Sequence, residues 1–210
     1  VFFMTFCALS SAKGMDIKMK LSVKDLINVG LFSVIYFIMF TIAGILGYIP
    51  VCVVILPLIA GVLGGIPFVL FVIKEQKFGA VTLMGLITGL LTFLVGQTWM
   101  SILFGLVFGL LGDVIMKTGD YKNWTRNVVG YCVFTLWTIG TMLPMWIMRD
   151  TFFANYRENG GTDAYIDAVM ALTPNYMVLV IIVLAIVGGF LGTMLGKIVL
   201  KKHFEKAGIA

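Results

Sequence analysis

Four long stretches without a charged residue make up most of the chain. They cover residues 26–73, 78–112, 127–148 and 168–196. A helix needs about 20 residues to cross a hydrocarbon layer of about 30 Å. The first two stretches are long enough for two helices each, and the last two for one each. The pattern therefore predicts an all-α integral membrane protein with six transmembrane helices, at approximately 26–46, 51–73, 78–95, 99–116, 127–149 and 174–197.

Composition agrees with this fold class and leaves no room for a soluble domain. Hydrophobic residues make up 60% of the 210 residues and charged residues 12%, whereas globular chains contain roughly 45–50% apolar and 25% charged residues. We expect a single membrane domain over residues 19–206. Residues 1–18 are expected to be an N-terminal extension without an assigned function, because their apolar part is too short to span a membrane.

The basic residues are distributed unequally between the two sides of the predicted bundle. Thirteen Lys and Arg residues lie on one side, and only Arg149 and Arg157 lie on the other. Cytoplasmic loops of membrane proteins are enriched in Lys and Arg, so both termini are expected to be cytoplasmic. This topology accounts for the net charge of +5 without nucleic acid as a partner.

The longest outer loop, residues 150–173, contains a signal for a helix. Residues 159–161 (Asn-Gly-Gly) form a flexible hinge, and residues 162–163 (Thr-Asp) are a typical helix start. Apolar residues then follow at helical spacing. The loop is predicted to form a short amphipathic helix on the outer surface, which is either a hinged lid or an interfacial connector.

The fifth predicted span carries a polar face that points to a ligand site. Within residues 131–150, Trp, Thr and Met side chains share one helix face that leads to Arg149. Aromatic planes with amide and hydroxyl groups suit a flat, polar heterocycle. The predicted substrate-binding residues, drawn from the outer ends of several spans, are Gln97, Trp99, Trp137, Thr138, Thr141, Arg149 and Asn175.

Several of these residues also have a purely structural interpretation. Trp99 lies where interfacial aromatic belts occur. Trp137 is deep enough inside its span to serve in core packing. Arg149 suits pairing with headgroups and water. The sequence leaves these alternatives open.

Catalytic and energy-coupling chemistry is missing from the sequence. The only histidine, His203, lies in the basic tail, and no Walker lysine motif is present. We therefore expect no metal site, no cofactor and no ATP hydrolysis by this chain. Asp113, at the cytoplasmic end of a span, is interpreted as an interhelical or snorkelling partner and not as an acid catalyst. The chain is expected to bind a solute and not to be an enzyme.

Glycines recur four positions apart in several spans. The pairs are Gly61/Gly65, Gly85/Gly89, Gly105/Gly109 and Gly192/Gly196. Such spacing lets helix backbones approach closely, where dispersion drives association. It predicts either packing within the bundle or a docking face for another membrane subunit.

Several short stretches resemble one known family. They are 24–26 (KDL), 46–50 (LGYIP), 64–68 (GGIPF), 77–79 (KFG), 136–140 (LWTIG) and 146–150 (WIMRD). Over about residues 20–200 the chain resembles the substrate-binding S components of energy-coupling factor (ECF) transporters, and more narrowly their Trep_Strep group. The segment WIMRD is the most specific part of this resemblance.

The resemblance implies a vitamin-binding subunit in the cytoplasmic membrane of a bacterium. Its partners would be an ECF transmembrane coupling subunit and two ABC-type ATPases. Many S components present small residues spaced by three on the first span to the coupling subunit, a pattern that residues 29–34 match poorly. The candidate docking residues are Gly30, Ser33, Gly61, Gly65, Gly85, Gly89, Gly192 and Gly196.

Two functions remain after this reading of the sequence. The first is the substrate-capture subunit of an ATP-dependent ECF-type vitamin importer, which binds a hydroxymethylpyrimidine- or pyridoxine-like compound at the outer face. The second is a stand-alone secondary carrier or channel for a small solute, which would transport without partner subunits. The site chemistry does not choose between the ring compounds.

Overall fold

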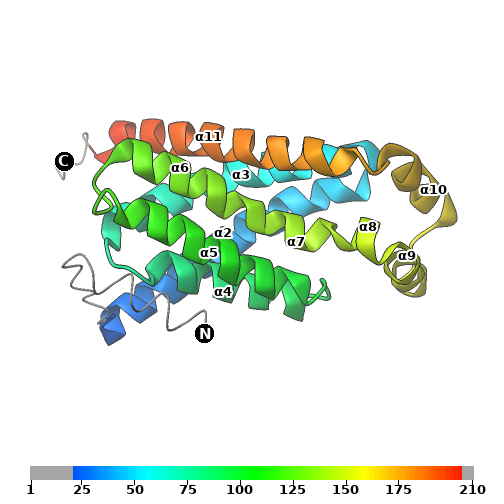
Figure 1. Cartoon of the computed structure of the whole chain (residues 1–210), viewed down its shortest axis with the longest axis horizontal. Helices are drawn as coiled ribbons and strands as arrows, with labels where there is room; N and C mark the ends of the chain where they lie inside the picture. The colour runs from blue at the N-terminus through cyan, green and yellow to red at the C-terminus, as the bar shows by residue number, and fades with distance from the viewer. Residues whose placement is uncertain (1–20, 205–210) are drawn as a thin grey trace, which may run out of the picture.

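The computed structural model describes residues 21–204, and this part of the chain is a bundle of helices without strands (Figure 1). The predicted extension over residues 1–18 lies outside the described residues. The elements are α2 (Val23–Ile45), η1 (Leu46–Tyr48), α3 (Pro50–Lys74), α4 (Ala80–Leu94), α5 (Met100–Lys117), α6 (Trp124–Phe134), η2 (Thr135–Thr138), α7 (Ile139–Met142), α8 (Pro144–Ile147), α9 (Arg149–Glu158), α10 (Asp163–Leu172) and α11 (Met177–Phe204).

Five segments of the described chain are long and apolar enough to cross a membrane. They are Val23–Tyr48, Pro50–Lys74, Met100–Lys117, Trp124–Ile147 and Met177–Lys202. The remaining apolar helix, α4, has 15 residues, which at 1.5 Å per residue gives about 22 Å and is short of a hydrocarbon layer of about 30 Å. The all-α membrane fold is confirmed, and the predicted count of six spans is not.

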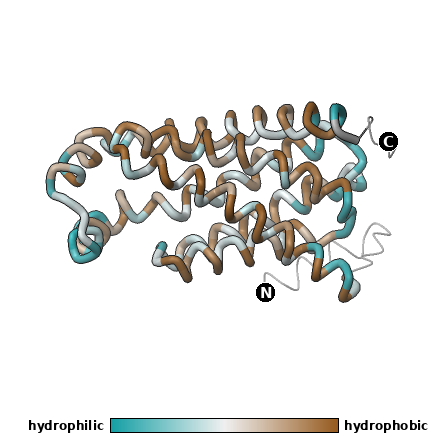
Figure 2. The backbone as a smooth tube through the Cα atoms, turned by 180° about the vertical axis from the view of Figure 1, so that it is seen from behind, coloured by the Kyte–Doolittle hydropathy of each residue, from teal (hydrophilic) through white to brown (hydrophobic). Residues whose placement is uncertain are grey.

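Polar residues gather at the two ends of the bundle (Figure 2). The end at which α2 begins and α11 ends is here called the basic end, and the opposite end, with α9 and α10, the lid end (Figure 1). Under the positive-inside rule the basic end is expected to face the cytoplasm. The basic end carries Lys24, Lys74, Lys77, Lys117, Lys122, Arg126, Lys197, Lys201 and Lys202.

Glycine contacts bring α3 and α11 together at backbone distance. A Cβ atom added to Gly65 would lie 2.2 Å from the carbonyl carbon of Gly192, and one added to Gly61 would lie 2.7 Å from that of Gly188. The helices α4 and α5 meet in the same way, since a Cβ on Gly85 would lie 2.2 Å from the carbonyl oxygen of Gly105. The glycine pattern therefore serves packing within this bundle.

The candidate docking residues differ in their accessibility. Gly61, Gly65, Gly85, Gly89, Gly192 and Gly196 are all buried in these helix contacts. Ser33 is also buried, and its hydroxyl donates to the carbonyl oxygen of Val29 at 2.7 Å. Gly30 is half-buried on α2, with open space where a Cβ would lie. A docking role for these residues stays a prediction.

Asp113 links α5 to the start of α4 at the basic end. Its carboxylate accepts hydrogen bonds from the backbone N–H groups of Gly79 (2.7 Å) and Thr82 (3.1 Å), and from the Thr82 hydroxyl (2.8 Å). The Tyr121 hydroxyl donates to the other oxygen at 2.6 Å. Burial and the adjacent carboxylate raise the pKa of Tyr121, which therefore stays a donor. Asp113 thus caps α4 from a neighbouring helix, as an interhelical partner.

The fifth predicted span forms one candidate span but not one uniform helix. The α6 helix passes into the 3-10 turn η2 and then into α7, and along this stretch the hydroxyls of Thr135, Thr138 and Thr141 each donate to the carbonyl oxygen three residues earlier, at 2.7–2.8 Å. Pro144 has no N–H to continue the α-helical ladder. The chain then breaks at Met148 (φ −125°, ψ 44°), and α9 begins at Arg149. The predicted single helix over 127–149 is replaced by these shorter segments.

Candidate ligand-binding site

A large cavity of about 660 Å³ lies at the lid end of the bundle. This volume falls within the range of roughly 300–1,000 Å³ that is typical of small-molecule sites. Its walls come from α2, η1, α3, the α4–α5 loop, α7–α8 and α9–α10. The lining residues are Phe37, Phe40, Thr41, Gly44, Ile45, Gly47, Tyr48, Val53, Leu56, Val95, Gly96, Gln97, Thr98, Thr141, Met142, Pro144, Met145, Met148, Thr151, Phe152, Asn155, Tyr156, Asn159 and Tyr165.

The cavity wall combines aromatic rings with neutral polar groups. Six lining residues are Phe or Tyr, four are Thr, three are Met, and three carry amides. Among the residues that the structure describes, no charged side chain lines the cavity. The wall therefore offers no counter-charge to an ion and is better suited to an uncharged ligand that can stack and form hydrogen bonds.

The floor of the cavity rests on the aromatic core of the bundle. Thr141 is only 6% exposed and donates its hydroxyl hydrogen to the carbonyl oxygen of Thr138, so the lone pairs of its oxygen can accept from a ligand. Trp137 lies one layer deeper and is fully buried. Its ring packs against Phe40, with 4.8 Å between the ring centroids, and its indole N–H donates to the Tyr36 hydroxyl at 3.2 Å. Trp137 supports the floor but does not line it.

The helices α9 and α10 form the roof. The rings of Tyr156 and Tyr165 stack with centroids 5.0 Å apart, and the Tyr165 hydroxyl donates to the carbonyl oxygen of Gly47. Burial raises the pKa of Tyr165, which keeps this hydroxyl protonated. The turn between the helices needs glycine at both positions, because Gly160 has φ +88° and a Cβ on Gly161 would lie 2.0 Å from the Tyr156 ring.

The predicted helix of the outer loop is present as α10. It begins after Thr162, whose hydroxyl oxygen accepts from the Tyr165 N–H at 3.3 Å. Ile166 and Val169 are fully buried in a hydrophobic cluster with residues of α3, α7 and α11. The helix is therefore amphipathic and packs onto the bundle, as predicted. Its movement as a lid stays a prediction.

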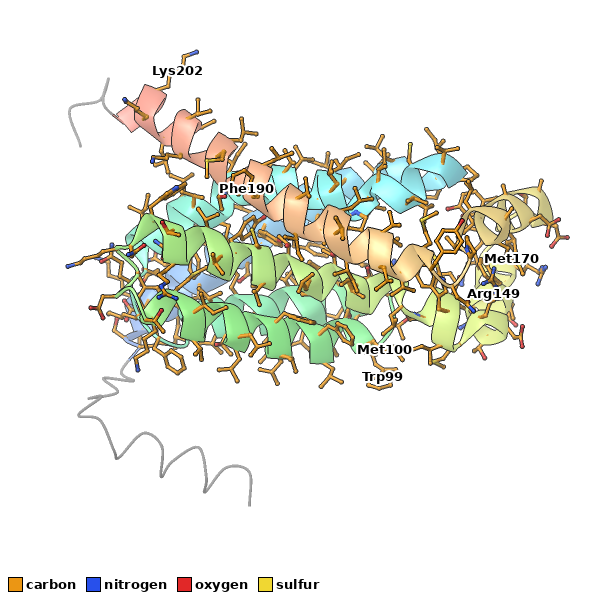
Figure 3. The ribbon with its side chains drawn as sticks, turned by 45° about the horizontal axis from the view of Figure 1, so that its top comes forward. Trp99, Met100, Arg149, Met170, Phe190 and Lys202 are labelled. Carbon is orange, nitrogen blue, oxygen red and sulfur yellow. The ribbon has the colours of Figure 1, made fainter. Side chains whose placement is uncertain are left out.

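Arg149 connects the two roof helices instead of lining the cavity. Its guanidinium donates to the carbonyl oxygens of Met170 (3.1 Å) and Thr173 (3.4 Å), at the C-terminal end of α10 (Figure 3). A cation at this position satisfies carbonyl groups that have no partner within the helix and complements the helix dipole. Arg149 thus holds α10 against α9.

Two other predicted site residues lie outside the cavity wall. Trp99 is 53% exposed and points away from the bundle beside Met100 (Figure 3). Asn175 is exposed at the start of α11 and does not line the cavity. Of the seven predicted residues, the cavity brings together Gln97 and Thr141, while Trp99, Trp137, Thr138, Arg149 and Asn175 are outside its wall. A binding role for Gln97 and Thr141 stays a prediction, and the position of the other five outside the wall favours other roles for them.

Comparison with protein families identifies the group to which the chain is related. The model of a family described as "Hypothetical bacterial integral membrane protein (Trep_Strep)" matches residues 23–206. The chain belongs to the Trep_Strep family. Comparisons with curated proteins and with solved structures gave no match. Together with the apolar helices, this membership shows that the Trep_Strep protein is a multi-pass membrane protein.

Most of the cavity wall in this Trep_Strep protein was not predicted from the sequence. The missed residues on α2 are Phe37, Phe40, Thr41, Gly44 and Ile45. They follow one another at positions i, i+3, i+4, i+7 and i+8, which places them on one helix face. This spacing was a usable signal. No sequence signal pointed to the lining residues of α9, such as Asn155 and Tyr156, because that helix was not predicted.

Replacing Arg149 of the Trep_Strep protein by methionine is expected to loosen the roof without unfolding the bundle. Hydrogen bonds from a charged group contribute roughly 1.5–3 kcal/mol, so amide exchange at the C-terminal end of α10 should rise about tenfold or more. Arg157→Met is the matched control, because Arg157 pairs with an exposed Asp163 at 2.6 Å and such pairs contribute about 1 kcal/mol or less. Hydrogen exchange with mass spectrometry measures the amide exchange of α10 in both variants. Equal exchange in the two variants would contradict the anchoring role.

Proposed function

We propose that this protein is the substrate-capture subunit of an ATP-dependent ECF-type importer. It takes up a small, uncharged, polar heterocycle of the hydroxymethylpyrimidine or pyridoxine type from the outer side of a bacterial cytoplasmic membrane. Its partners are an ECF transmembrane coupling subunit and two ABC-type ATPases. The observation that carries the proposal is the cavity of 660 Å³ under α9 and α10, whose described wall holds aromatic rings and amides but no charge.

The wall chemistry supports a ring compound as the ligand. Tyr156 and Phe152 offer ring faces on the roof, and Phe40 offers one on the floor. Aromatic contacts of this kind contribute area and preferred geometry. Gln97 and Asn155 have amide groups that can both donate and accept, which matches ring nitrogens and hydroxyl substituents. Phosphorylated forms of such compounds are disfavoured, because the wall offers their charge no partner.

A matched pair of amide variants tests the site. Gln97 lines the cavity and Asn175 does not, although both are exposed at the same end of the molecule. A hydrogen bond contributes about 1 kcal/mol, so Gln97→Ala should weaken binding about fivefold, and Asn175→Ala should leave it unchanged. Calorimetric titration of the purified protein with hydroxymethylpyrimidine and pyridoxine gives both values. Absence of binding to either compound, or equal effects of the two substitutions, would refute this site.

The partnership needs a separate experiment. The tagged chain, extracted from its native membrane in mild detergent, should bring down two ABC-type ATPases and a second membrane subunit. Uptake by liposomes that contain this chain alone, driven by an ion gradient, would instead support a stand-alone carrier.

A further inference from the structure

A second cavity, of about 330 Å³, lies at the basic end and plays no part in the proposed capture site. It is formed between the end of α3, the start of α6 and the middle of α11. The lining residues are Phe68, Val69, Val72, Ile73, Gln76, Tyr121, Lys122, Trp124, Asn127 and Thr193.

One side of this cavity is apolar and continues onto the lipid-facing surface. The α3 helix contributes Val69, Val72 and Ile73, and Ile73 is 54% exposed. Trp124, at the first position of α6, lines the cavity near the membrane surface. An amphipathic indole is favoured at this depth, where one side of the ring is apolar and the other is wet.

The other side of the cavity is positively charged. Lys122 lines it directly. The Lys197 ammonium lies 4.7 Å from the centroid of the Trp124 ring, one helical turn beyond Thr193 in the wall. Within the described chain neither lysine forms an ion pair, and Asp120, an exposed carboxylate in the same loop as Lys122, forms none either. Two cations therefore stand beside the cavity without a bound counter-charge from this part of the protein.

The cavity wall also contains an acceptor without a partner. The Asn127 side-chain N–H donates to the Tyr121 carbonyl oxygen at 2.7 Å. Its side-chain oxygen is buried and accepts no hydrogen bond from residues 21–204. An unpaired buried acceptor is unfavourable, so this part of the wall is not optimised for packing within the bundle alone.

We propose that this cavity binds the headgroup of an anionic phospholipid of the inner leaflet, of the phosphatidylglycerol type. The phosphate lies between the ammonium groups of Lys122 and Lys197, and the headgroup fills the volume beside Trp124 and Asn127. The acyl chains run along the exposed apolar surface beside Ile73. Basic cavities between transmembrane helices on the cytoplasmic side suit such headgroups, and the volume of 330 Å³ limits the occupant to the headgroup region.

Native mass spectrometry of the purified protein, titrated with phosphatidylglycerol and with phosphatidylcholine, tests this site. The wild type should bind phosphatidylglycerol more tightly. Each lysine near an anionic lipid contributes about fivefold in affinity, so the double variant Lys122→Gln/Lys197→Gln should lose roughly 25-fold. Lys202→Gln is the matched control, since Lys202 lies at the tip of α11, away from the cavity (Figure 3). It should bind as the wild type does.

A second variant separates shape from charge. Ile73→Trp fills the opening of the cavity while keeping both lysines, and it should also weaken phosphatidylglycerol binding, because Ile73 is largely exposed and its enlargement leaves the core intact. Four outcomes would overturn the proposal: equal binding of the two lipids, wild-type affinity in the double variant, an equal loss in Lys202→Gln, or displacement of the lipid by glycerol 3-phosphate at similar concentration. The last would indicate a site for a small free anion.

Discussion

Replacing Gly65 by valine is expected to destabilise the bundle more than any other single change considered for this protein. A Cβ at this position would lie 2.2 Å from the carbonyl carbon of Gly192 and 2.4 Å from its oxygen. Because these neighbours are backbone atoms, no side chain can move aside, and α3 and α11 must separate. Overpacking a tight interior costs roughly 1–3 kcal/mol, and we expect valine to reach or exceed the upper value.

Thermal unfolding in detergent, followed by tryptophan fluorescence, measures this effect. Gly30→Ala is the control, because no atom lies within 4 Å of a Cβ at Gly30. In a helix interior, alanine is favoured over glycine by about 1 kcal/mol, so this control should keep or raise the melting temperature. A melting temperature of Gly65→Val within a degree or two of the wild type would contradict the backbone contact between α3 and α11.

Removal of the Asp113 carboxylate is expected to have the second largest effect. In Asp113→Ala, the N–H groups of Gly79 and Thr82 and the hydroxyl of Tyr121 lose the acceptor that now binds them at 2.6–3.1 Å. The Tyr121 hydroxyl is left unpaired in a buried site, which costs roughly 1–3 kcal/mol, and the partly buried groups of Gly79 and Thr82 add less, so we expect a loss of about 2–3 kcal/mol in the free energy of unfolding. The start of α4 should be the first part to open.

Two further variants, Asp113→Asn and Asp120→Asn, serve as controls for this experiment. Asp113→Asn keeps one acceptor oxygen and should lose less than Asp113→Ala. Asp120→Asn removes a charge from an exposed residue of the adjacent loop that forms no ion pair within the described chain, so it should stay within about 0.5 kcal/mol of the wild type. Hydrogen exchange of α4 together with the melting temperature distinguishes the three. Equal stability of Asp113→Ala and Asp120→Asn would refute the capping role.

The all-helical fold and the start of α10 could be predicted because both depend on local sequence. Long charge-free runs require helices in lipid, since every backbone group must find a partner within the segment. The Thr162-Asp163 pair supplies a cap whatever the rest of the fold does. The predicted span at 78–95 differs from α4 by three residues, because Gly79, with φ +95°, precedes the first helical residue Ala80, and the helix ends at Leu94.

The candidate site could be predicted only in part, because lipid and protein interior are equally apolar. Hydropathy therefore does not tell which face of a transmembrane helix points inward. Trp137 and Gln97 both look like ligand contacts in the sequence, yet only Gln97 lines the cavity, and Trp137 hydrogen-bonds Tyr36 in the core. Likewise, Asp113 gave no sign that its partners would come from the start of α4 and from Tyr121.

The glycine contacts determine which parts of the molecule can move. Since backbone touches backbone, we expect α3 with α11 and α4 with α5 to move as two rigid pairs. We expect conformational change at the break at Met148, after the irregular fifth span, and at the turn of residues 159–161 between α9 and α10, which can absorb rotations of the backbone. Under the proposed function, we expect a ligand to enter and leave by movement of α9 and α10, without a change in the packing of α3 on α11 or of α4 on α5.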